Sequence, residues 1–240
     1  MKYYIYFSFL LISISLNAQN NLPENSVIDT VFSPKLTGES FFENKQYIGE
    51  QYFNKDWEKG DVLLSTGEMV YNKRLKYNGL FDEVIWMNNS NFGKYQLDKS
   101  SISDFWLNST TGKTIHFKHI NVGDSTGGHA TDIFAQVGIE GKVSLYIQRK
   151  ISITGEANVY INNTLFYFNN IGESPLYFIK LTSNHFTKLS RISRKVLLKV
   201  FPEKKKEIVK LMSDNHLNLK NESDLIKLIG LLNKEVFLEK

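Results

Sequence analysis

Short runs of alternating apolar and polar residues recur from Gly60 to Ile179, separated by turn-forming residues at intervals of about 8 to 12 positions. A period of two places successive side chains on opposite faces of a strand, so each run can bury one face. Runs this short and this close together pair most simply with their neighbours along the chain. The pattern predicts an antiparallel β-meander over residues 49–179, either as a sheet or as a partly open barrel.

Residue types add detail to this meander. The alternation in Met69–Tyr77 predicts that one set of side chains faces inward: Met69, Tyr71, Leu75 and Tyr77. Asn162 and Asn163 predict a hairpin turn between two short strands. Ser152–Ala157, which contains a glycine, predicts a further turn.

Past Ile179 the apolar period becomes helical, beginning with Leu189, Ile192, Val196 and Val200. Pro202 suits the first turn of a second helix, and Asn221 with Asp224 resembles a capping box before a third. These signals predict a C-terminal helical hairpin, packed on the sheet, over residues 180–240. The predicted fold class is therefore α+β.

The N-terminus has the pattern of a secretory signal peptide over residues 1–18. Lys2 precedes an apolar run from Ile5 to Leu16, and Ala18 supplies a small residue at the cleavage position. The run is too short to span a bilayer, so no transmembrane span is expected after cleavage. Residues 19–48 are predicted to be a poorly ordered lead-in, with an extended piece or short helix near its end. We expect an exported protein, periplasmic or secreted.

Cysteine is absent from all 240 residues. No disulfide can stabilise an exported form, so stability has to come from a hydrophobic core. A bacterial lipoprotein needs a cysteine at the cleavage site, and we therefore do not expect lipid anchoring there. Without cysteine or an HExxH helix, the sequence predicts no metal site, and no cofactor-binding motif is present.

Positive charge is concentrated near the C-terminus. Residues 180–240 contain 14 Lys and Arg against 7 Asp and Glu, whereas the whole chain has a net charge of +4. Such a segment either forms the solvated face of helices or attracts anionic lipid or polysaccharide. Export argues against a nucleic-acid partner.

Four residues are candidates for a binding site. Asp124 and His129 lie in a glycine-rich segment, and Asp132 follows it closely. Arg74 lies on a strand whose basic residues are interleaved with tyrosines, a pattern found in sugar-binding surfaces and in the polar outer faces of sheets. His116 and His119, three apart on a strand, should point to opposite faces and not share a metal. The serine in the glycine-rich segment lacks the contexts of a serine-protease triad.

Several stretches resemble uncharacterised secreted proteins of the Bacteroidota. The stretches are the signal-peptide end at Asn17–Gln19, the run Gly60–Leu64, the run Gly141–Tyr146, and the closing segment Asp224–Asn233. The resemblance implies export and this architecture, and it implies no activity, cofactor or catalytic residue.

We therefore expect a non-catalytic binding or interaction module of the cell envelope, whose partner is an envelope protein or a polysaccharide. One alternative is a hydrolase with its site on residues 121–132. The other is peripheral attachment to an anionic surface through the basic C-terminal helices.

Overall fold

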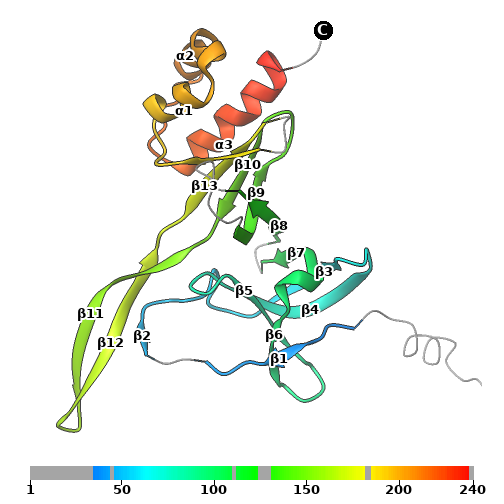
Figure 1. The fold of residues 1–240 in the computed structure, drawn as a ribbon, viewed down its shortest axis with the longest axis vertical. Coiled ribbons are helices and arrows are strands. Elements are labelled where there is room, and N and C mark those ends of the chain that lie inside the picture. The colour runs from blue at the N-terminus through cyan, green and yellow to red at the C-terminus, as the bar shows by residue number, and fades with distance from the viewer. Residues whose placement is uncertain (1–34, 44–45, 110–111, 124–130, 182–184, 238–240) are drawn as a thin grey trace, which may run out of the picture. The chain divides into compact units, whose positions relative to one another are not determined.

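The computed structural model describes residues 35–237, except 44–45, 110–111, 124–130 and 182–184. By its internal contacts the chain divides after Ser33, and every described residue belongs to the second unit. This unit is mostly antiparallel β-structure followed by helices, which confirms the α+β prediction (Figure 1).

Eleven strands form one sheet, in the order β1-β6-β5-β4-β3-β7-β8-β9-β10-β13-β14. The strands are β1 (Gly38–Ser40), β3 (Glu58–Leu64), β4 (Met69–Asn78), β5 (Glu83–Met87), β6 (Lys94–Leu97), β7 (Ile102–Asn108), β8 (Thr114–Val122), β9 (Thr131–Ile139), β10 (Ser144–Gln148), β13 (Leu176–Lys180) and β14 (Phe186–Leu189). Most neighbours in this order are consecutive in the chain, as a meander requires. Within the described residues no ladder joins β1 to β14, so the sheet is open.

The predicted lead-in contributes two short strands. β1 pairs with β6 at the edge of the large sheet, and β2 (Tyr47–Ile48) pairs in parallel with β12 (Thr164–Glu173). The expectation of an extended piece near the end of residues 19–48 is thus confirmed.

β11 (Ile151–Ile161) and β12 form a long hairpin that projects beyond β10 and β13; we call it the arm (Figure 1). Asn162 and Asn163 both have positive φ, as the predicted two-residue turn requires. The predicted turn at Ser152–Ala157 is wrong, because this segment lies within β11. A register shift between Ile153 and Gly155 accommodates its glycine as a β-bulge instead.

The predicted inward direction of Tyr71 in β4 is wrong, because a second β-bulge interrupts the strand. Val70 is 3% exposed and Tyr71 is 63% exposed, the reverse of the predicted alternation. The pairing of β4 with β3 shifts register here, and Asn72 has a φ of 52° with its N–H donating to the Asp61 carboxylate. The extra residue reverses the facing of Tyr71, while Leu75 and Tyr77 stay fully buried as predicted.

The helices are α1 (Arg194–Val200), α2 (Lys205–Asp214) and α3 (Glu222–Leu231). α1 begins later than predicted, because Leu189 pairs in β14 and Ser193 caps the helix by accepting the Val196 N–H. Asn221 caps α3 as predicted, through the Asp224 N–H at 2.8 Å. The Asp224 carboxylate accepts from the Asn218 N–H, so the reciprocal bond of a capping box is not made.

One face of the C-terminal strands packs against these helices. Val143, Leu145, Ile147 and Ile179 from the sheet meet buried leucines and isoleucines of α1, α2 and α3 in one core. Arg149 fixes the start of α3 through a bidentate ion pair with Glu222, at 2.8 and 2.6 Å. The predicted packing of the helices on the sheet is therefore confirmed.

A second core lies between the strands of the N-terminal half. Phe105, Phe117, Phe134 and Tyr77 are completely buried there, and their rings contact one another. A third, smaller cluster contains Ile133, Tyr146 and Phe178 and occupies the sheet face that the helices leave uncovered. In the C-terminal half, one face of the sheet is therefore covered by the helices and the other is not.

Candidate functional site

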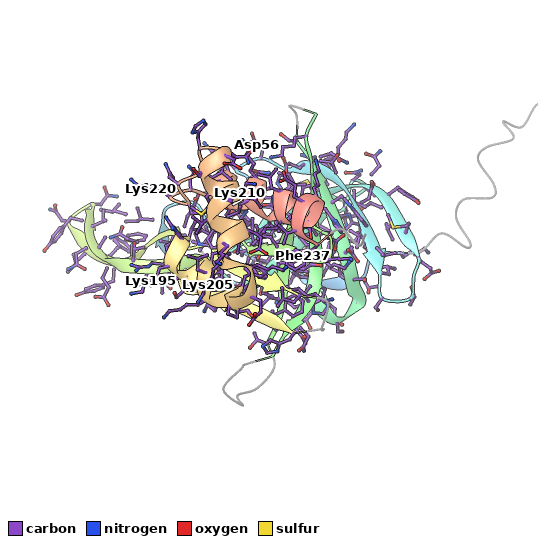
Figure 2. All side chains as sticks on the ribbon, turned by 90° about the horizontal axis from the view of Figure 1, so that it is seen from above. Asp56, Lys195, Lys205, Lys210, Lys220 and Phe237 are labelled. Carbon is purple, nitrogen blue, oxygen red and sulfur yellow. The ribbon has the colours of Figure 1, made fainter. Side chains whose placement is uncertain are left out.

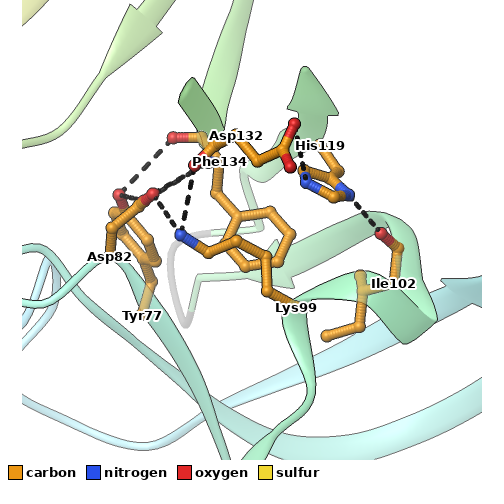
Figure 3. A network of polar contacts seen from close by, with 7 residues as sticks. All are labelled: Tyr77, Asp82, Lys99, Ile102, His119, Asp132 and Phe134. Carbon is orange, nitrogen blue, oxygen red and sulfur yellow. Dashed lines mark hydrogen bonds and ion pairs between the residues drawn. The ribbon is translucent and has the colours of Figure 1, made fainter. Parts of the chain in front are cut away.

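A network of polar contacts centres on Asp82, in the turn between β4 and β5 (Figure 3). Its carboxylate accepts from the Tyr77 hydroxyl at 2.6 Å and pairs with the Lys99 ammonium at 2.6 Å. The Phe134 N–H donates to both oxygens at 3.3 Å. Asp82 has a φ of 59°, a conformation that Asp tolerates better than most residues. One short acidic turn therefore joins β4, the segment before β7, and β9.

The network continues to the predicted site residue Asp132 (Figure 3). The Lys99 ammonium donates to the Asp132 carbonyl at 3.4 Å, and the Asn121 amide donates to the Asp132 carboxylate at 2.7 Å. His119 Nε2 lies 3.9 Å from the same carboxylate, beyond hydrogen-bonding range. His119 Nδ1 donates to the Ile102 carbonyl at 3.0 Å, and the buried Nε2 has no hydrogen-bond partner among the described residues.

Beside this network lies a cavity of 440 Å³. Its charged lining comprises Glu39, Asp82, Glu83, Asp98 and Lys99. Asp82 and Lys99 are already paired with each other, and both Asp98 oxygens accept from Ser100 in the turn that follows. Burial raises the pKa of Glu83, and the charge of Asp82 raises it further, against the opposing effect of Lys99. Three of the five charged groups thus have structural roles.

The Tyr77 hydroxyl is a proton donor within this network. Burial raises its pKa well above the ordinary value, and the nearby Asp82 carboxylate adds to the effect. A phenol held protonated in this way stabilises Asp82 but is not a base. The network therefore joins strands, and it offers no pairing of a nucleophile with a base.

The predicted separation of His116 and His119 is confirmed. His116 contacts the Asp104 carboxylate at 2.7 Å and stacks on Trp106, whereas His119 packs beside Phe134 in the core. Within the described ranges, no three His, Asp or Glu side chains are placed to hold a metal ion.

Asp104 gives a prediction for acid stability. Burial raises its pKa, but hydrogen bonds from His116 and Ser103 and the positive charge of Lys118 outweigh this, and the net shift is downward. The pKa in the unfolded chain is about 3.9, so the stabilisation is complete above that value and is lost as the pH falls through the lower folded pKa. We expect Asp104→Asn to lose less stability than the wild type below about pH 4.

Urea midpoints measured across this pH range test the prediction. Asp56→Asn removes an exposed carboxylate and is the control; it should follow the wild type. An identical acid dependence in the wild type and Asp104→Asn would contradict the prediction.

Of the four predicted site residues, the structure describes Arg74 and Asp132, and these two lie apart. Arg74 lies on β4 opposite Lys59 and Met87, far along the sheet order from β9, which contains Asp132. Lys76, two residues on, places its ammonium 4.3 Å from the Tyr52 ring centroid. Asp124 and His129 lie outside the described residues. The hydrolase site on residues 121–132 therefore stays a prediction.

A basic face lies on the solvent side of the first two helices. It comprises seven exposed side chains: Arg194, Lys195, Lys199, Lys205, Lys206, Lys210 and Lys220. Among the described residues none of the seven has a carboxylate within ion-pair distance. Figure 2 looks down on this face and shows Lys195, Lys205, Lys210 and Lys220 around the helices.

Amphipathic helices create this face. In α2 the buried side chains Ile208, Leu211 and Met212 point to the core, so Lys205, Lys206 and Lys210 point away from it. Three acids belong to the same region and only partly offset the charge: Glu203, Asp214 and Glu207, which pairs with Lys204. The uneven charge seen in the sequence is therefore concentrated on one surface.

No protein-family model, curated protein or solved structure matches this chain. Within the described ranges, no helix is both long and apolar enough to cross a bilayer.

Proposed function

We propose that this protein is a non-catalytic binding module of the cell envelope that attaches to anionic lipid surfaces through its basic face. The observation that carries the proposal is the set of seven exposed cations on α1, α2 and the segment after them, none of which forms an ion pair with another described residue. The signal-peptide pattern of residues 1–18 supports placement in the envelope.

The strength of such an attachment can be estimated. A lysine or arginine near an anionic membrane contributes about 1 kcal/mol, and the contribution falls off within a Debye length. Several cations held on one rigid face can therefore give measurable binding without any inserted apolar segment. The same physics requires that the binding weaken as salt is added.

Sedimentation with lipid vesicles tests the proposal. We expect binding to vesicles containing phosphatidylglycerol, little binding to pure phosphatidylcholine vesicles, and loss of binding at high salt. Changing Lys205, Lys206 and Lys210 to Glu should weaken binding on the order of 100-fold, because three favourable charges become unfavourable.

The matched control changes three exposed lysines of the strand-rich half, Lys55, Lys59 and Lys113, to Glu. It alters net charge equally and should bind far better than the helix variant. Equal losses of vesicle binding in both variants would mean that net charge alone determines binding, and would contradict the proposal. Binding to an anionic polysaccharide but not to the vesicles would overturn the lipid assignment.

A further inference from the structure

A groove of 500 Å³ lies on the sheet face opposite the helices. Cross-strand pairing places Gln148 opposite Leu176, and Phe178 opposite Lys188, so these four side chains share that face. The groove runs over β8, β9, β10, β13 and β14, on the same surface as the small cluster that contains Ile133 and Phe178. It does not overlap the basic face.

The groove has both apolar and polar surface, in similar amounts. Five of its lining side chains are hydrocarbon or aromatic: Val122, Ile133, Leu176, Phe178 and Phe186. Ile133 and Phe178 are nearly completely buried and form its floor. Its volume is in the range of pockets that bind small molecules, about 300 to 1,000 Å³. A mixed lining of this kind fits a ligand that has an apolar body and a polar head.

Gln148 is the polar group at this floor. It is 8% exposed, and no hydrogen bond joins its side-chain amide to any other described residue. The amide thus has donors and an acceptor available for a polar group of a bound molecule.

Two exposed lysines complete the lining. Neither Lys150 nor Lys188 has an ion-pair partner among the described residues. Lys150 also borders a smaller cavity that contains Glu173. Two ammonium groups and an amide beside an apolar floor match a molecule with an anionic head.

We infer that this groove binds a small anionic amphiphile: a carboxylate with an aliphatic or aromatic body. The carboxylate pairs with Lys150 and Lys188, the body lies on Ile133 and Phe178, and Gln148 donates to the head. This site is separate from the proposed membrane-binding face. Its lining residues lie on the sheet and its connecting segments and not on the helices, and its ligand is a single dissolved molecule.

Isothermal titration of the full chain with decanoate tests the inference. We expect saturable binding in solution, with decan-1-ol and acetate binding much more weakly because each lacks one half of the recognised chemistry. Lys188→Gln should weaken decanoate binding by about 10-fold or more, the range for a lost charge-assisted hydrogen bond. Lys59→Gln makes the same change on an exposed strand lysine outside the groove and should leave binding unchanged.

Gln148→Leu separates binding from folding. The variant should also bind decanoate more weakly, yet melt at the same temperature as the free wild type or higher, because leucine adds apolar surface at a position that is 8% exposed. Absence of decanoate binding up to about 1 mM would overturn the inference, as would equal binding of decan-1-ol or an unchanged Lys188→Gln variant. Vesicles are not used, so failure here leaves the membrane proposal standing.

Discussion

Phe105→Ala is expected to lower the free energy of unfolding by about 3–5 kcal/mol. Phe105 is completely buried and its ring stacks on Phe117 at a centroid distance of 4.7 Å. Phe134 meets the same ring edge-on at 5.3 Å. Truncation removes both contacts and leaves a cavity that paired strands on both sides of β7 cannot easily close.

Urea denaturation followed by circular dichroism measures this change. Phe166→Ala in the arm is the matched control, since it makes the same substitution at a side chain that is 43% exposed and lies outside the buried clusters. It should cost less than about 1 kcal/mol. Similar losses at the two positions would mean that the ring cluster around Phe105 is not the centre of the N-terminal core.

Asp82→Ala should cost about 3 kcal/mol. The variant removes the acceptor of the Phe134 N–H and the partner of Lys99, and leaves the buried Tyr77 hydroxyl only the Phe134 carbonyl at 3.5 Å. It also places alanine at a φ of 59°, which adds about 1 kcal/mol of backbone strain to that loss.

Asp82→Asn is the companion variant for this experiment. Asparagine keeps an acceptor for Tyr77 and tolerates the left-handed conformation, so we expect less than half of the alanine effect. A double-mutant cycle with Tyr77→Phe should give a coupling of about 1 kcal/mol or more. A coupling near zero, or equal losses in the Asn and Ala variants, would mean that the network contributes little.

Much of the architecture could be predicted because side-chain period is a local property. Alternation in the strands, the two asparagines of the hairpin turn and the cap at Asn221 each depend on residues a few positions apart. The predictions failed where a bulge interrupted the period. Asparagine tolerates a positive φ, but the residue types around Tyr71 do not indicate that the Asn72 N–H bonds to Asp61, eleven residues away.

The candidate sites were harder to predict because they are made by pairing between distant segments. Gln148, Lys150 and Lys188 share a groove only because β10, β13 and β14 are neighbours in a particular register. The basic face was easier to anticipate, since its cations follow one another along two helices. Asp132 stays a candidate site residue, and its hydrogen bonds with Lys99 and Asn121 come from another turn and another strand.

The arm continues the two-stranded ribbon of β10 and β13, but the two parts of that ribbon differ in the number of neighbouring strands. β10 and β13 have neighbouring strands on both sides, whereas β11 pairs with β12 alone, and β12 gains only two residues of β2. Opening the arm therefore breaks one ladder and uncovers no part of the main cores. Amide hydrogen exchange should therefore differ on the two sides of Arg149. Local opening of the hairpin should control exchange in the arm, and global unfolding should control exchange in β10 and β13.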